Sequence, residues 1–149
     1  MSNEPDWEVK YGDNKKTQQW YDSDNKLHRE NGPALISYQD DTIILEEFYI
    51  HGVNFNKNGP ARIEYFDKND VEIETASLSK YNIKPPESRQ FGKIKGMLWC
   101  NESGKHHRED GPAYYVPSGN NGLYYLNGER TTKEEIDKLI IIKKLSGIK

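Results

Sequence analysis

The sequence contains little cysteine, little net charge and no long apolar run. Its one cysteine, Cys100, excludes an internal disulfide and a cysteine-rich zinc site. Residues 1–10 lack the apolar core of a signal peptide, and no apolar run approaches the roughly 18 residues of a membrane-spanning helix. The net charge of −3 predicts neither nucleic acid nor an anionic membrane as a partner. These absences favour a protein of the cytoplasm or of a virion.

Hydrophobic residues are scarce as well. They make up 34% of the 149 residues, and the mean hydropathy is −1.00. Ten tyrosines, four phenylalanines and three tryptophans compensate, because aromatic side chains bury a large area per residue. Such a sparse but bulky set suits a thin sheet better than a deep helical interior. The aromatic residues also recur in register with turn signals, which excludes disorder for most of the chain.

An internal repeat is the strongest signal in the sequence. In three segments a Gly-Pro-Ala triplet follows an aromatic residue by 11 or 12 positions. These segments are the first unit (20–34), the second unit (48–61) and the third unit (99–113), and a truncated fourth unit opens at 124. The spacing between the second and third triplets is nearly double, which predicts a worn repeat between residues 70 and 95. The triplets are Gly32, Pro33 and Ala34; Gly59, Pro60 and Ala61; and Gly111, Pro112 and Ala113.

Each unit predicts one β-hairpin. After the first triplet, Ala34, Ile36 and Tyr38 share one face of an extended segment, which is the period of a half-buried strand. Turn residues then follow at 39–41, 67–70 and 117–122, and the tight-turn dipeptides are His51-Gly52 and Asn127-Gly128. Successive hairpins predict a mainly β fold, in which antiparallel hairpin repeats form a twisted, meandering sheet.

Each position of the triplet has a physical interpretation. Glycine adopts backbone angles that a bulkier residue before proline resists. Proline fixes the entry into the strand and removes a donor that the ladder does not need there. Alanine leaves room for an aromatic side chain of a neighbouring unit. Since stacked units bury surface against each other, one unit alone is not expected to fold.

Two segments depart from the repeat. Residues 75–95 break the pattern, and we expect an irregular insertion there, formed from an eroded repeat. From residue 131 the period changes to that of a helix, which Thr132 opens with a capping box. We therefore expect a repeat domain over 1–130. The C-terminal helix over 131–149 is expected to cap the open end of the sheet.

The repeat resembles the "HRxxGPA" repeats of phage and giant-virus proteins, which are similar to distant relatives of the MORN repeat. The pairs that match the pattern fully are His28-Arg29 and His107-Arg108. The second unit departs from it, with Phe55 and Asn56 in those places. The resemblance covers about 20–130 and implies a β-hairpin array of viral origin. It implies a scaffold or a contact surface for proteins or lipids rather than a catalytic activity.

No residue pattern predicts catalysis, a metal site or a cofactor. The His-Arg-Glu segments recur with the repeat, whereas an active site is usually a single constellation. A histidine in the turn is expected to donate to a backbone carbonyl, and an arginine to stack on Trp20 or Trp99. The adjacent His106 and His107 point to opposite faces of a strand and make poor joint metal ligands. Cys100 has no activating partner, so we interpret it as a small hydrophobic residue.

The preferred function is non-catalytic binding in a virion or another protein assembly. The partner is then a virion subunit or a host protein, contacted through the sheet and the isoleucine-rich tail. An exposed aromatic stripe and stable oligomers are the markers of this class, and a homo-oligomer remains open. Membrane association through the short C-terminal helix ranks last.

The alternative is a viral counter-defence protein that binds a host protein or sequesters a small anionic, nucleotide-like signal. Its marker is a single pocket on which cationic and aromatic side chains from two units converge. The residues assigned to such binding are Trp20, His28, Arg29, Trp99, His107 and Arg108. No residue is assigned a catalytic or metal-binding role.

Overall fold

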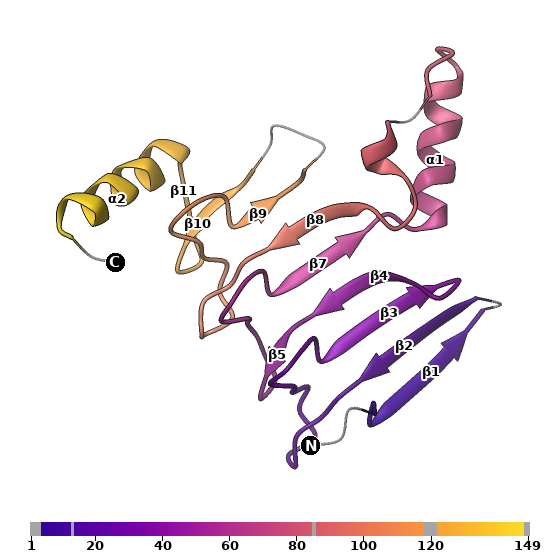
Figure 1. Cartoon of the computed structure of the whole chain (residues 1–149), viewed down its shortest axis with the longest axis horizontal. Helices are drawn as coiled ribbons and strands as arrows, with labels where there is room; N and C mark the ends of the chain where they lie inside the picture. The colour runs from indigo at the N-terminus through magenta and orange to yellow at the C-terminus, as the bar shows by residue number, and fades with distance from the viewer. Residues whose placement is uncertain (1–3, 13, 85, 118–121, 148–149) are drawn as a thin grey trace.

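The computed structural model of the chain describes residues 4–12, 14–84, 86–117 and 122–147. Its main element is one seven-stranded antiparallel sheet (Figure 1). The strands follow the order β1 (Trp7–Tyr11), β2 (Lys15–Gln19), β3 (Leu35–Gln39), β4 (Thr42–Glu47), β7 (Arg62–Tyr65), β8 (Ile94–Leu98) and β9 (Tyr114–Tyr115). The order in the sheet is the order in the chain, so the predicted mainly β meander of antiparallel hairpins is confirmed.

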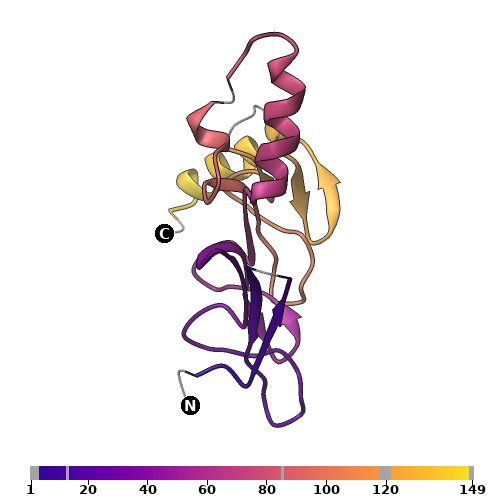
Figure 2. The same ribbon diagram turned by 90° about the vertical axis from the view of Figure 1, so that its right-hand side faces the viewer.

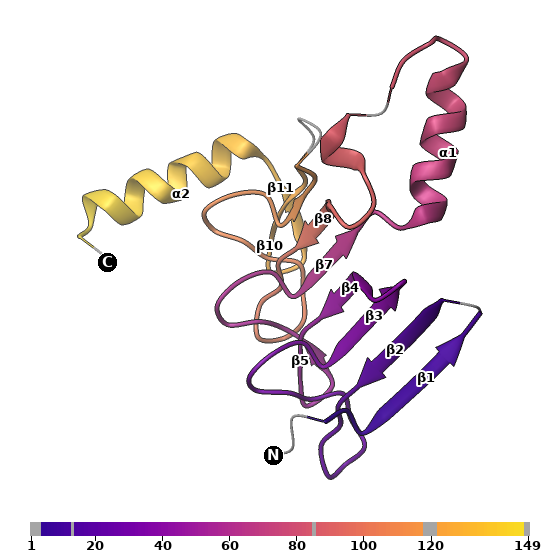
Figure 3. The same cartoon turned by 45° about the vertical axis from the view of Figure 1, so that its right-hand side comes forward.

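The loops of the repeat all leave the sheet at the same end of the strands. β2, β4 and β8 each lead into the residues that open a unit, and β3, β7 and β9 each begin after a triplet. The loops therefore stack along one side of the sheet (Figure 3). Two of them contain small hairpins, β5 (Tyr49–Ile50) with β6 (Val53–Asn54) and β10 (Tyr124–Leu126) with β11 (Glu129–Thr131).

The alanines of the triplets form the most buried row of the protein. Ala34, Ala61 and Ala113 are each 0% exposed. The Ala34 backbone N–H donates to the carbonyl of Glu47 (2.8 Å), and its carbonyl accepts from the N–H of Trp20 (2.9 Å). Ala61 bonds in the same way to the chain on both of its sides. The sheet is thus continuous through the triplets, and a methyl group is the side chain that packs there.

The sheet is thin, because none of the described helices or strands forms a second layer over the strands β1 to β4. Figures 1 and 2 place both helices at the margins of the molecule, and its side view is narrow. Within the strands of this sheet only Ile36, Ser37 and Gly96 are fully buried. Several of the larger buried side chains lie in the repeat loops instead, among them Trp20 (6% exposed) and His28 (5%). The expected thin sheet with a sparse core is present.

Two elements of the structure are not predicted by the repeat. The hairpin β1–β2 precedes the first unit and has no triplet. Helix α1 (Lys68–Ser79) follows β7, where the spacing predicts a worn repeat. Asp67 caps this helix by accepting from the N–H of Asp70 (2.8 Å), and none of its residues is buried. A helix with no buried stripe gives no periodic signal in the sequence.

The expected irregular insertion at 75–95 therefore needs correction. Its first residues belong to α1, a 3₁₀ turn (Glu87–Arg89) lies in its middle, and β8 begins at its end. Two ion pairs hold this segment together: Arg89 binds Glu74 (2.6 Å) and Lys95 binds Asp70 (2.9 Å). The predicted turn at 117–122 lies largely outside the described residues, as do 148 and 149 of the predicted C-terminal helix.

The C-terminal helix α2 (Lys133–Leu145) begins at Thr132, whose hydroxyl accepts from the N–H of Glu135 (3.2 Å). This is one half of the predicted capping box. Ile136 is 1% exposed and is the only buried residue of the helix. Farther along, Ile142 and Leu145 are 59% and 83% exposed. The helix is thus anchored by Ile136 in its first turn and lies beside β10 and β11 (Figure 1). Lys143 in its last turn forms an ion pair with Glu109 of the third unit, so the expected cap reaches this unit but buries only Ile136 of the helix.

The anchoring role of Ile136 can be tested by urea-induced unfolding. We expect Ile136→Ala to lower the free energy of unfolding by about 2–4 kcal/mol, because it leaves a cavity in a fully buried site. The matched control Ile142→Ala removes an exposed side chain and should change the free energy by less than about 0.5 kcal/mol. Equal effects of the two substitutions would contradict the anchoring role.

Candidate functional site

The six residues assigned to binding lie in two copies of one arrangement, in the first and third units. The guanidinium carbon of Arg29 lies 3.9 Å from the ring centroid of Trp20, and that of Arg108 lies 3.8 Å from Trp99. Each guanidinium also donates from Nη1 to the proline carbonyl of its own triplet, at 3.2 Å and 3.3 Å. The predicted stacking of arginine on tryptophan is therefore confirmed in both units.

The same guanidinium explains the glycine of the triplet. A Cβ on Gly32 would lie 3.3 Å from Cζ of Arg29, and a Cβ on Gly111 would lie 3.1 Å from Cζ of Arg108. Neither glycine has a positive φ. These glycines therefore do not supply left-handed backbone angles, and the close approach of the arginine gives a second reason for glycine at these positions.

The second unit has no arginine to bind the proline carbonyl of its triplet. Asn56 stands in the arginine position, and its Nδ2 donates to the carbonyl of Pro60 (3.1 Å). A Cβ on Gly59 would meet this amide at 3.4 Å, which is ordinary contact. The bond to the proline carbonyl is therefore the common feature of the three units, and stacking on tryptophan is an addition made by arginine.

The histidines connect one unit to the next. Nδ1 of His28 accepts the backbone N–H of His51 (3.0 Å), and Nδ1 of His107 accepts that of Asn127 (3.0 Å). His51 and Asn127 have positive φ angles of 47° and 51°, and the glycine after each is also positive. Two such residues in succession form the tight turn predicted for these dipeptides. The histidines thus hold the turn of the following unit as acceptors and not as the expected donors to a carbonyl.

An aspartate adds a second contact between the first two units. Oδ1 of Asp22 accepts the N–H groups of Asp24 and Lys26, both at 2.9 Å, and Oδ2 lies 2.8 Å from Nδ1 of His51. The hydrogen bond from His51, followed by that from the Lys26 backbone, lowers the pKa of Asp22 below its usual value. This carboxylate is therefore ionised at neutral pH.

The third and fourth units make the same contact with amides. Oδ1 of Asn101 accepts the N–H groups of Ser103 and Lys105, both at 3.0 Å, and Nδ2 donates to Oδ1 of Asn127 (3.1 Å). Amide side chains do not transfer protons under ordinary conditions. Since the two pairs occupy equivalent places, the carboxylate–histidine pair Asp22–His51 is interpreted as a structural contact that positions the turn.

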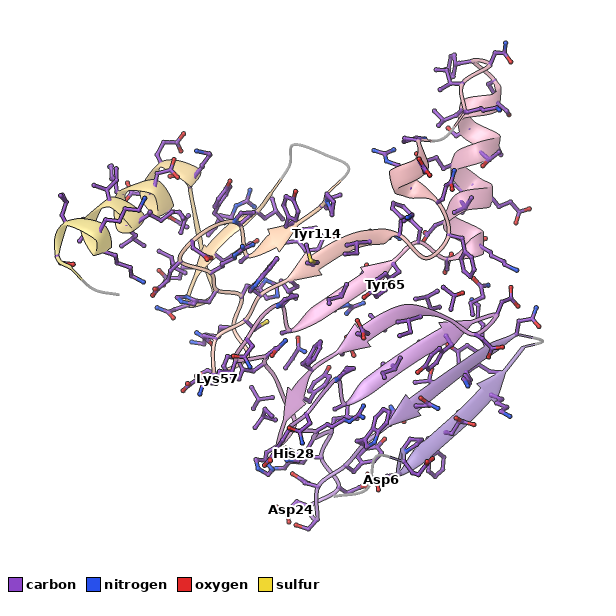
Figure 4. All side chains as sticks on the ribbon, viewed as in Figure 1. Asp6, Asp24, His28, Lys57, Tyr65 and Tyr114 are labelled. Atoms are coloured by element: carbon purple, nitrogen blue, oxygen red, sulfur yellow. The ribbon has the colours of Figure 1, made fainter. Side chains whose placement is uncertain are left out.

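The two copies do not meet on one pocket. The first triplet leads into β3 and the third into β9, and β4, β7 and β8 lie between them. Four strand spacings amount to about 19 Å. Figure 4 shows His28 at one end of the row of loops and Tyr114 toward the other. Arg29 and Arg108 are therefore too far apart to bind one small anion together.

The remaining chemistry is limited. Burial raises the pKa of the Cys100 thiol to about 11, so it is protonated at neutral pH, in agreement with its interpretation as a small hydrophobic residue. Among the described residues, no group of three or more His, Cys, Asp or Glu could hold a metal ion. In the same part of the chain, no helix has the length and apolarity needed to cross a membrane.

A groove on one face of the sheet is not predicted by the motif. It has a volume of about 310 Å³ and lies where β7, β8 and β9 meet the third and fourth units. Tyr114 and Tyr125 line it, and a Cβ on Gly96 would lie 2.9 Å from the Tyr114 hydroxyl, so this ring lies over the strand. Residues 96 and 98 lie on one face of β8, and residue 114 pairs with residue 98. The sequence does not give this pairing, so the groove could not be predicted from it. Its other lining residues are Arg62, Glu64, Met97, Leu98, His106 and Leu123.

No family model, curated protein or solved structure matches the chain. The resemblance to viral repeat proteins rests on the motif alone and stays a prediction. The function is therefore argued below from the geometry of the two surfaces that the loops and the sheet present.

The arginine-over-glycine contact can be tested with a double-mutant cycle. Gly111→Ala should destabilise the protein by displacing the guanidinium, and Arg108→Ala should remove the stack and the bond to Pro112. In the Arg108→Ala background the alanine at 111 has room, so we expect a coupling free energy of about 0.5–3 kcal/mol from urea unfolding. Gly59→Ala, which faces Asn56, is the matched control and should cost less. Additive effects at 108 and 111 would refute the contact.

The histidine contact predicts a pH dependence. Burial lowers the pKa of His107, and the charge of Lys143 lowers it further. The unfolded chain therefore binds more protons than the folded one below its unperturbed pKa of about 6.5. The stabilising contribution is complete above that pH and is lost as the pH falls through the lower folded pKa. On going from about pH 7.5 to about pH 5, we expect the wild type to lose more unfolding free energy than His107→Gln, which keeps an acceptor without titrating.

The neighbouring histidine provides the control for this experiment. His106→Gln should lose as much stability over the same pH range as the wild type, because His107 is unchanged. A wild type and a His107→Gln variant with parallel pH profiles would show that the histidine does not hold the turn in its neutral form.

Proposed function

We propose that the chain is a non-catalytic binding module that presents one face of its sheet to a protein partner, in a virion assembly or in contact with a host protein. The observation that carries this proposal is the extent of uncovered surface. A compact monomer of this mass is expected to expose about 7,800 Å². The chain exposes 9982 Å².

The excess of about 2,200 Å² is large on the scale of protein interfaces. A specific complex of ordinary size buries about 800 Å² on each partner. Two features account for so open a surface. Most residues of β2, β3 and β4 are only half-buried and all of β1 is exposed, and the two helices together bury a single residue, Ile136. A chain with this much exposed surface on a regular sheet can bury part of that surface against another protein.

The histidines and arginines of the repeat are engaged in contacts of the fold, which supports a non-catalytic role. In each copy the histidine accepts a backbone N–H and the arginine donates to a backbone carbonyl. The neutral histidine tautomer that accepts at Nδ1 is fixed by this bond. These side chains organise loops, and the same contacts recur with amides elsewhere in the chain.

The groove beside Tyr114 and Tyr125 is the best anchor for a partner side chain. Arg62 is one of its lining residues and pairs with Glu47 (3.1 Å) and Glu64 (2.8 Å), so the arginine charge is already neutralised. Leu98 and the two tyrosines provide apolar surface in the same lining. Such a site favours an apolar or aromatic residue of a protein, which is the usual centre of a binding hot spot.

The alternative, sequestration of a small anionic ligand, has weaker support. Its marker is the convergence of Arg29 and Arg108 on one pocket, and three strands of the sheet, β4, β7 and β8, lie between the two copies. Each guanidinium is already stacked on a tryptophan and bonded to a carbonyl. Protein binding through the sheet is therefore the function that the geometry supports best.

The proposal can be tested by affinity capture with a groove variant. The tagged chain is expressed in the cells that naturally contain it, crosslinked, and compared with Leu98→Glu, which places a charge in the groove. We expect at least one protein to be retained by the wild type and lost with Leu98→Glu. The control Leu78→Glu changes a half-buried leucine of α1 outside the groove and should retain the same protein.

Native mass spectrometry of the purified chain distinguishes the alternative. Release of a small anionic molecule on denaturation, together with an unchanged set of captured proteins for Leu98→Glu, would overturn the proposal. Each variant is first compared with the wild type by circular dichroism, so that loss of capture is not mistaken for unfolding.

A further inference from the structure

Strand β1 is an open edge of the seven-stranded sheet. It pairs with β2 on one side, and no other described strand pairs with it. All five of its residues are exposed, although three are large and apolar: Trp7 (57%), Val9 (39%) and Tyr11 (46%). Proteins usually shorten, bend or cover such an edge, because its free N–H and C=O groups can pair with another strand.

The strand is well fixed in the protein. Its five residues pair in unbroken register with β2, from Trp7 opposite Gln19 to Tyr11 opposite Lys15. Asp6, just before the strand, accepts the backbone N–H of Tyr21 (2.7 Å) and ties its start to the first unit. Figure 4 places Asp6 at the lower end of this edge. The edge is therefore a preformed template and not a loose segment.

The two faces of β1 differ in chemistry. Trp7, Val9 and Tyr11 lie on one face, because side chains alternate along a strand. Glu8 and Lys10 lie on the other face. The sequence Trp-Glu-Val-Lys-Tyr is thus arranged symmetrically about Val9, with aromatic residues at both ends and opposite charges between them and the centre.

We propose that β1 pairs antiparallel with β1 of a second copy of this chain, around a two-fold axis through Val9. In that register Trp7 faces Tyr11 of the second copy, and Glu8 faces Lys10. Both kinds of contact occur twice, since a two-fold interface uses the same surface on each subunit. Cross-strand aromatic pairs and opposite charges are the contacts that stabilise neighbouring strands.

Other registers are disfavoured by charge. A shift by two residues places Glu8 opposite Glu8, or Lys10 opposite Lys10, on the axis. A shift by one residue places the aromatic face of one copy beside the charged face of the other. A parallel pair in register also brings like charges side by side. The strand is therefore complementary to itself in one antiparallel register, which is why the occupant is a second copy rather than an unrelated strand.

The dimer joins the two sheets into one sheet of twice the number of strands, with the aromatic stripes continuous across the axis. It goes beyond the proposed function, because β1 and the groove lie at opposite ends of the strand order. The two surfaces can therefore be disrupted separately. Leu98→Glu should leave the dimer intact, and a β1 variant should retain the partner captured through the groove.

Sedimentation velocity of charge-reversed chains tests the register. The wild type is expected to sediment as a dimer of the 17.3 kDa chain. Glu8→Lys and Lys10→Glu each place like charges opposite each other twice, and each should weaken self-association by at least about tenfold in Kd. An equimolar mixture of the two variants should dimerise again, because every pair in the heterodimer then contains opposite charges. This recovery also shows that neither variant is misfolded.

Matched controls reverse exposed charges away from β1. Lys57→Glu and Glu102→Lys should dimerise like the wild type. A wild type that remains monomeric at about 100 µM, which is weaker than most specific interfaces, would overturn the proposal. So would a dimer that survives both reversals, or a mixture that fails to recover.

Disulfide crosslinking tests the position of the axis. Opposed residues of antiparallel strands have Cα atoms about 4.5–5.5 Å apart, within the range that a disulfide spans. Val9→Cys should therefore form a covalent dimer readily on mild oxidation. Glu8→Cys, whose partner across the pair is Lys10, should do so far more slowly. Equal crosslinking of the two variants would refute the two-fold axis at Val9.

Discussion

The rest of the structure depends on hydrogen bonds between side chains and the backbone N–H and carbonyl groups of the repeat loops. No described element forms a second layer over the strands β1 to β4, and helix α2 reaches the third unit only, through Lys143 and Glu109. The other repeat loops therefore depend on side chains of the loops themselves for their contacts. An arginine or asparagine instead bonds to the proline carbonyl of its own unit. A histidine accepts an N–H from the turn of the next unit. Buried backbone groups need such partners, and here the partners also fix the order in which units stack.

Much of this architecture could be predicted from the sequence, because the triplets and the tight-turn dipeptides act locally. Gly-Pro-Ala marks the start of a strand, and Asn127-Gly128 closes a hairpin, without reference to distant residues. The role of His28 could not be predicted in the same way, because its acceptor bond depends on where the next turn lies. The hairpin β1–β2 lacks the triplet, and α1 lacks a buried face, so neither has the signal on which the prediction rested. The groove beside Tyr114 depends on strand register between units that are far apart in the chain.

The repeats themselves act as natural comparisons. Asp22 with His51 and Asn101 with Asn127 make equivalent contacts with different chemistry, a carboxylate with an imidazole in one case and two amides in the other. Arginine and asparagine likewise alternate opposite the proline carbonyl. These differences between units show which contact every unit makes and which contacts are made by one residue type alone. They indicate that geometry at the turn is the common requirement and that charge there can vary.

The second unit carries Phe55 where the first and third carry a histidine, so it provides no ring nitrogen to the unit that follows. Its junction with the third unit is held by the sheet itself, through Ala61 and Leu98, and by the packing of Gly104 near Val53. α1 is inserted in the chain at this same place. In a protein whose units contact only their neighbours, cooperativity passes through each junction in turn. The chain is accordingly built as two pairs of units, each joined by a histidine, and the junction between the pairs lacks this hydrogen bond. We expect partial unfolding to begin at this junction.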